Sequence, residues 1–201
     1  MFEMRKSQVT IEGMEPGLLM HRFSEKTYEG GGKGKGKVLP PEEYAKEVAY
    51  WSKDGTHLII PATNIHRCLI QVSTVYRIPE QRKMRITPFV AGSLHVSPEE
   101  IPLKRPSGEL IKDYEIDIRS VVIRGRGRVL RTRPKVYPWE ATFYISYITA
   151  DFPANFPKIL EEMLNEAGRR IGLMDYRPAK GGPFGKFRVK EMKEVTTEEV
   201  K

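Results

Sequence analysis

The sequence predicts an α+β fold, a ferredoxin-like (RRM-like) βαββαβ sandwich with insertions, in which two helices pack against an antiparallel sheet. Three observations predict this class. The chain has 201 residues, enough for one well-packed domain and too few for two full ones. Two segments, beginning near residues 63 and 156, carry apolar side chains at helical spacing. The segments before, between and after them have the composition and alternation of strands.

The chain begins with a predicted strand and an inserted helix. Val9 and Ile11 alternate with polar neighbours and predict a strand over residues 7–11. Pro40-Pro41-Glu42-Glu43 is typical of a helix start, because proline presets the first turn and acids favour the helix N-terminus. We expect this helix to end near residues 54–55.

The first helix of the sandwich is predicted directly after a short apolar strand at residues 57–61. Thr63 is a suitable N-cap. One stripe of the helix is apolar and the opposite stripe is polar, which is the pattern of a helix with one buried face. The apolar stripe consists of Ile65, Cys68, Leu69, Val72 and Tyr76.

The middle of the chain is predicted to be rich in strands. Residues 89–96, 114–123 and 141–148 have strand composition, and residues 124–136 form a basic extended stretch. The basic, proline-bounded segment 79–88 is predicted to be a loop.

The second helix is predicted over residues 156–171, where Gly172 supplies the stop signal. Residues 184–189 predict the closing strand. We therefore expect a single domain over residues 1–190, followed by a polar tail at 191–201.

The charge is unevenly distributed. The chain carries a net +8, and because the tail holds four acids and two lysines, residues 1–190 carry +10. The segment 120–139 contains six basic residues and no acid. Strand periodicity places the first three on one face and the last three on the other. The six are Arg124, Arg126, Arg128, Arg131, Arg133 and Lys135.

Such a density of arginine predicts a polyanionic partner, and a nucleic-acid backbone is the commonest one. Tyr137 and Trp139 follow at once and could stack on bases. The alternative is that these cations protect an exposed strand edge from aggregation. The segment YEGGGKGKGK at residues 28–37 is predicted to be a flexible loop. Its Lys33, Lys35 and Lys37 could track phosphates, or the loop could be a plain linker.

No metal or cofactor site is predicted. The four histidines are scattered without metal-ligand spacing, and the single Cys68 excludes an intrachain disulfide and a multi-cysteine zinc site. Cys68 lies on an apolar stripe and is expected to be a buried thiol. No apolar run is long enough for a membrane helix, so we expect a cytoplasmic protein with no membrane partner. His21, next to Arg22, is the one candidate for metal-free ribonuclease chemistry.

Three segments, in this order, share a pattern with a known group of proteins: VTIEGMEPGLL at residues 9–19, IPATNIHRCL at 60–69 and GGPFGKFRV at 181–189. Together they resemble the RAMP superfamily, the RRM-like proteins of CRISPR ribonucleoproteins. The three segments are also similar to those of related phage or prophage proteins of the same layout. In this resemblance the segments are the opening strand and turn, the strand-to-helix junction, and the glycine-rich loop before the final strand. Ala62 and Pro183 depart from the usual pattern.

The resemblance implies either a backbone subunit that binds single-stranded RNA without cutting it, or a processing ribonuclease. The lack of a catalytic cluster in the sequence favours the non-catalytic kind, which coats or scaffolds a nucleoprotein complex. We expect single-stranded RNA or DNA as a partner, with self-association or other subunits. The alternatives are a metal-independent endoribonuclease using His21 and a structural or assembly protein of a virus or mobile element. The expected contacts are Arg22, Lys33, Lys35, Lys37, Arg67, Arg124, Arg126, Arg128, Arg131, Arg133, Lys135, Trp139, Arg177 and Lys186.

Overall fold

The main sheet is antiparallel and joins strands that lie far apart in the sequence. The computed structural model describes residues 3–23, 39–78, 81–123 and 127–195. The strands of this sheet follow the order β11-β1-β10-β7-β3, and β6 also pairs with β10. They are β1 Met4–Gly13, β3 Ile59–Pro61, β6 Leu94–Ser97, β7 Glu100–Lys104, β10 Glu140–Ile148 and β11 Phe187–Val195. An α+β class is confirmed.

The alternation of apolar and polar residues decides which face of this sheet is buried. Val9 of β1 pairs with Phe143 of β10, and both side chains are fully buried. On the opposite face Thr10 and Thr142 share a hydrogen bond of 3.0 Å between their hydroxyls. A period of two along each strand therefore gives the sheet one core face and one polar face.

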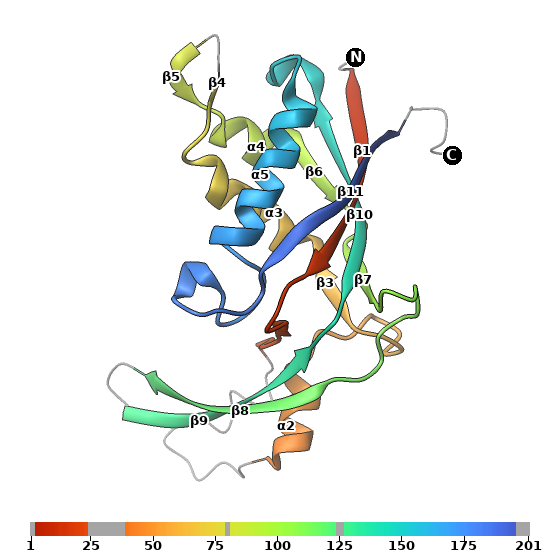
Figure 1. Cartoon of the computed structure of the whole chain (residues 1–201), viewed down its shortest axis with the longest axis vertical. Coiled ribbons are helices and arrows are strands. Elements are labelled where there is room, and N and C mark those ends of the chain that lie inside the picture. The colour runs from red at the N-terminus through yellow and green to blue at the C-terminus, as the bar shows by residue number, and fades with distance from the viewer. Residues whose placement is uncertain (1–2, 24–38, 79–80, 124–126, 196–201) are drawn as a thin grey trace.

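Two long helices cover the core face (Figure 1). They are α3 Ala62–Ser73 and α5 Phe156–Arg170, which confirm the two predicted helices. The predicted N-cap of α3 is wrong, because Pro61 occupies that position and Thr63 lies within the first turn. Cys68 of α3 donates to the Ala167 and Gly172 carbonyls, which ties the two helices together. Gly168 of α5 meets β11 closely, because a Cβ there would lie 2.0 Å from the Phe187 carbonyl oxygen.

A long β-hairpin projects from the main sheet (Figure 1). Its strands are β8 Glu115–Ile123 and β9 Gly127–Val136, and the short strand β2 Leu18–Leu19 pairs with the base of β9. The inserted helix α2 Pro41–Val48 lies beside this hairpin and ends before the predicted residues 54–55. The hairpin and α2 thus form one end of the molecule.

The opposite end differs from the sequence prediction. Residues predicted as a strand over 89–96 instead form α4 Thr87–Ser93 followed by β6. Pro88 in the first turn presets the helix, and Val90 is buried, so packing overrides the strand preference of Phe89 and Val90. The segment 79–88, predicted as a loop, contains β5 Gln81–Arg85, which pairs with the preceding strand β4 Arg77–Ile78 as a short hairpin.

The final segments connect α5 to the sheet. The short helices η1 Thr149–Asp151 and η2 Pro178–Lys180 flank α5. Strand β11 begins later than predicted and continues past Val189 to Val195, where it pairs with Lys6. The predicted loop at 28–37 lies outside the described residues. Among the helices that the structure describes, none is long and apolar enough to cross a membrane.

Candidate nucleic-acid interface

The β8–β9 hairpin has two faces of different chemistry. Its register places Asp117 opposite Arg133 and Arg119 opposite Arg131, and directly opposed residues of an antiparallel pair share a face. We call the side with Arg119, Arg131, Arg133 and Lys135 the basic face. Arg131, Arg133 and Lys135 therefore share one face, as the period of two predicts.

The structure describes only part of the first set of predicted arginines. Strand β8 ends at Ile123 and β9 begins at Gly127, and Arg124 and Arg126 lie outside the described residues. Arg128 alone is described. It is exposed and points away from the basic face, because it shares a face with Val122, its partner in register.

Acids neutralise much of the basic face. Lys135 Nζ lies 2.9 Å from Glu115 Oε2, and the Arg119 guanidinium lies 2.6 Å from Asp117 Oδ1. Arg133 Nε donates to Asp175, which comes from the turn after α5. These three cations already have counterions within the protein, so they add little net charge for a polyanion to neutralise.

Arg133 is a structural residue in this arrangement. Its side chain is 8% exposed, and its Nη1 is buried without a hydrogen-bond partner among the described residues. Trp139 is 1% exposed and packs against Gly13, where a Cβ would lie 2.1 Å from the indole nitrogen. Neither side chain offers an accessible surface to a phosphate or a base.

A polar cluster at the edge of the basic face brings together His21, Tyr44 and Arg131. Arg131 Nη1 lies 3.1 Å from Tyr44 Oη and 3.3 Å from His21 Nε2, and the latter two atoms are 3.3 Å apart. His21 follows β2, and Tyr44 comes from α2. Both bonds of Arg131 use Nη1, so its Nη2 has no protein partner among the described residues.

The cluster holds His21 in its neutral form near pH 7. Burial lowers the pKa of His21, and the positive charges of Arg131 and Arg133 lower it further, while Asp175 opposes the shift. Nε2 can then accept a hydrogen bond from Arg131, which places the ring proton on Nδ1. The neutral histidine thus serves as the acceptor of this hydrogen bond.

A second group of cations lies outside the basic face. The backbone N–H of Arg22 donates to the Val48 carbonyl at 2.7 Å, which places Arg22 beside the end of α2 with its side chain exposed. Arg67 is exposed on α3. None of Arg22, Arg67 or Arg128 has a carboxylate within ion-pair distance in the part of the chain that the structure describes.

The glycine-rich segment is packed against the protein rather than open. Gly185 has φ +72°, and a Cβ there would lie 2.0 Å from the Leu173 carbonyl oxygen, so only glycine fits. Arg177 Nη1 donates to the Met174 carbonyl at 2.8 Å, and Arg177 and Lys186 are both half-buried. Phe184 of this segment lies under the Arg119 guanidinium, 4.6 Å from the ring centre, which joins the segment to the hairpin.

The polar face of the main sheet carries both paired and unpaired cations. Arg188 contacts Glu12 at 2.5 Å, and Lys190 contacts Glu140 at 2.6 Å. Lys6 of the same face lies 4.4 Å from the centre of the Tyr144 ring and has no carboxylate within ion-pair distance among the described residues. At the hairpin end the corresponding uncompensated cations are Arg22 and Arg128.

Three residues of this region were missed by the sequence analysis: Tyr44, Arg119 and Asp175. Arg119 alternates with Asp117 along a predicted strand, and this spacing was the available signal. Tyr44 and Asp175 carry no local signal, because they meet the hairpin only through the fold. Lys33, Lys35 and Lys37 lie outside the described residues.

The described residues contain no group of three potential metal ligands. Burial raises the pKa of the Cys68 thiol to about 12, so this side chain stays protonated and inert.

Comparison with known proteins gives a likeness of fold. No family model matches the sequence, and no curated protein matches it. A chain of the type III-B Cmr-β complex, solved by cryo-EM bound to cognate target RNA, is similar with a TM-score of 0.55 at 11% identity. The similarity covers 96% of this chain and 61% of that chain, so the protein spans less than two thirds of its length. A chain of a type IV-B CRISPR complex is similar at a TM-score of 0.46 and 11% identity, over 96% of this chain and 91% of that one. The chain therefore shares its fold with a component of a CRISPR complex.

Proposed function

We propose that this protein is a non-catalytic, RAMP-type subunit of a cytoplasmic CRISPR ribonucleoprotein and that it binds single-stranded RNA. The observation that carries the proposal is the set of uncompensated arginines at the hairpin end: Arg22, Arg128 and Arg131. A phosphate backbone supplies the missing negative charges, and each neutralised phosphate releases counterions.

The arrangement of the core supports the RAMP part of the proposal. Strands β1, β6, β10 and β11 lie in the order β11-β1-β10-β6, with α3 between β1 and β6 in the chain and α5 between β10 and β11. We take this as a ferredoxin-like unit of a single domain, to which the hairpin and α2 are added. The predicted domain end at residue 190 moves to Val195, because β11 pairs with β1 up to that residue. RNA is the preferred partner because the similar Cmr-β chain comes from a complex bound to RNA.

The test is the affinity for a fluorescein-labelled single-stranded oligouridylate, measured by fluorescence anisotropy. Arg22→Gln and Arg128→Gln should each weaken binding, because each removes a phosphate contact. The matched control is Lys53→Gln, since Lys53 is also exposed but already pairs with Glu99 at 3.1 Å. Equal affinities for wild type, both arginine variants and the control would refute the proposal.

The polar cluster supports a second candidate, a metal-independent endoribonuclease. Neutral His21 could take the proton of a 2′-hydroxyl on Nε2 as its oxygen attacks the adjacent phosphorus, once Arg131 turns from Nε2 to the charged phosphoryl oxygens. The bond to the 5′-oxygen breaks, and this oxygen takes a proton from Tyr44 or water, leaving a 2′,3′-cyclic phosphate and a 5′-hydroxyl. Cleavage of RNA in EDTA by wild type and not by His21→Ala would establish this candidate. If neither wild type nor His21→Ala cleaves RNA, the nuclease candidate is refuted and RNA binding without cleavage remains.

A further inference from the structure

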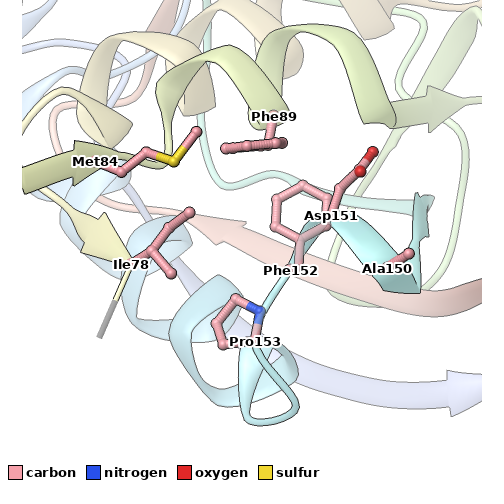
Figure 2. A pocket seen from close by; sticks show the side chains of 7 residues that line it. All are labelled: Ile78, Met84, Phe89, Ala150, Asp151, Phe152 and Pro153. Carbon is pink, nitrogen blue, oxygen red and sulfur yellow. The ribbon is translucent and has the colours of Figure 1, made fainter. Parts of the chain in front are cut away.

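A small apolar pocket of about 370 Å³ lies in the part of the molecule formed by β5, α4 and η1. Figure 1 places β5 and α4 at the end opposite the β8–β9 hairpin. Figure 2 shows the rings of Phe89 and Phe152 around the pocket, with Met84 and Ile78 on one side. The remaining lining residues are Ala150, Asp151 and Pro153. The volume is at the lower end of the roughly 300–1,000 Å³ typical of binding pockets.

The walls of the pocket combine a rigid part and an adaptable part. The Phe152 ring is held in place, because it stacks on Phe156 with 3.9 Å between ring centres and meets Tyr147 edge to face at 5.5 Å. Phe89 is tilted steeply against Phe152, with 6.4 Å between the ring centres. Met84 is 39% exposed, and its unbranched thioether side chain adjusts readily to an occupant. An aliphatic chain can therefore pack between a fixed aromatic wall and a flexible one.

Asp151 supplies the pocket with one negative charge. Its Oδ2 accepts a hydrogen bond from the Ser93 hydroxyl, and its Oδ1 has no hydrogen-bond partner among the described residues. Asp151 is the only charged residue in the lining of this pocket, and within the described part of the chain no cation lies within ion-pair distance of it. The occupant should therefore combine an aliphatic chain with a cation at its end.

A lysine side chain has this combination. Its four-carbon stem packs along apolar surface while its ammonium reaches a polar partner. The single unpaired oxygen of Asp151 suits an ammonium, which is a point charge, whereas a guanidinium makes its strongest contact with both oxygens of a carboxylate. We propose that the pocket binds a lysine side chain of a different protein subunit, with its stem against Phe89 and Phe152 and its Nζ on Asp151 Oδ1. In naming a further subunit as the partner, this rests on the proposed function.

The test uses NMR of protein with 13C-labelled methionine methyl groups, in which the Met84 signal, assigned with Met84→Leu, reports on the pocket. The probe is acetyl-Leu-Lys-Leu-amide, whose capped ends carry no charge. The matched probe has norleucine in place of lysine, which keeps the stem and removes the ammonium. The lysine peptide should shift the Met84 signal in a saturable way. The norleucine peptide should bind about tenfold more weakly, because it loses a hydrogen bond between two charged groups.

Asp151→Asn should remove most of this difference between the two peptides, because the carboxylate is the group that recognises the ammonium. The control is Asp113→Asn, since Asp113 is exposed and lies outside the pocket lining, and it should leave the difference unchanged. A Met84 signal that does not respond to the lysine peptide would overturn the proposal. Equal binding of the two peptides to wild type, or the same difference in Asp151→Asn as in wild type, would overturn it as well.

Two further measurements test the other possible occupants. n-Butylammonium carries the lysine stem and charge without a peptide, and it should bind more weakly than the lysine peptide. If it binds as tightly, the pocket is a site for free amines and the assignment to a protein subunit falls. Sedimentation velocity should give the same result for wild type and Asp151→Asn. Self-association that Asp151→Asn loses would assign the pocket to a second copy of this chain and overturn the assignment to a different subunit.

The anisotropy assay separates failure of this proposal from failure of the proposed function. Asp151→Asn should bind oligouridylate as wild type does, because the pocket lies at the opposite end from the hairpin. If the lysine peptide does not bind and wild type still binds oligouridylate through Arg22, the RNA-binding proposal stands and the lysine site falls. If the peptides follow the pattern above and wild type does not bind RNA, the lysine site stands and the RNA-binding proposal falls.

Discussion

The pairing of Arg133 with Asp175 makes a quantitative prediction about stability. Asp175→Asn removes the counterion of a guanidinium whose side chain is 8% exposed and whose Nη1 already has no hydrogen-bond partner among the described residues. Breaking a fully buried pair by removing one partner costs about 3–5 kcal/mol. The Asp175 side chain is 35% exposed, so water reaches part of the pair. We therefore expect a loss of about 2–3 kcal/mol in the free energy of unfolding.

Urea unfolding followed by circular dichroism measures this loss, and a fall in Tm of about 4–12 °C should accompany it. Glu115→Gln is the matched control. It removes an acid that is 74% exposed from its pair with Lys135 on the same face, and should cost at most about 1 kcal/mol. If Asp175→Asn unfolds at the same urea concentration as Glu115→Gln, Arg133 does not have the structural role assigned to it. In that case Arg133 would return to the set of candidate RNA contacts.

Two further predictions concern His21 and Gly168. The pKa of His21 is lowered in the folded protein, so only the unfolded chain gains a proton as the pH falls through about 6.5. The stability that the neutral histidine contributes above that pH is therefore lost below it. The fall in Tm between about pH 7.5 and pH 5.5 should be smaller in His21→Gln than in wild type. An equal fall in both proteins would contradict this prediction. Gly168→Ala should destabilise the protein by about 1–3 kcal/mol, because the added methyl meets the Phe187 carbonyl oxygen. Gly92→Ala in α4 meets open space and should stabilise by up to about 1 kcal/mol, so a gain in both variants would refute the close approach of α5 and β11.

The elements with clear periodicity were predictable from sequence. Val9 and Ile11 lie in β1, and the apolar stripe from Ile65 to Val72 is the buried face of α3, because a period of two or of 3.6 persists whatever the surroundings. Helix α4 was not predicted. Its Phe89 and Val90 suit a strand, whereas Pro88 in the first turn and the packing of this segment beside α3 favour the helix.

The residue types of the candidate site were predictable from the sequence, but the ion pairs and hydrogen bonds between them were not. The run of arginines is visible in the sequence, and the shared face of Arg131 and Arg133 follows from strand geometry. Which of these charges are neutralised depends on residues distant in the chain. Asp175 is 42 positions from Arg133, and Tyr44 is 87 positions from Arg131, so only the folded chain brings them together.

The apolar face of the hairpin was also outside what the sequence analysis could find. Alternation of Ile116 and Ile118 with charged neighbours predicts one buried face, as in any strand that covers a core. The structure places these side chains on a projecting hairpin, where the apolar side is exposed and the charged side contacts α2 and the turn after α5. Position in the fold, and not the strand pattern, decided which face was buried.

The salt dependence of RNA binding tests the central claim most directly. Each phosphate contact contributes about −0.7 to the slope of log K against log salt for a single strand, so contacts by Arg22, Arg128 and Arg131 should give a slope of about −2 or steeper. Anisotropy titrations of labelled oligouridylate between about 50 and 200 mM salt measure this slope, and Arg22→Gln should reduce its magnitude by about 0.7. An affinity that stays constant over this range, in wild type and variant alike, would contradict the account.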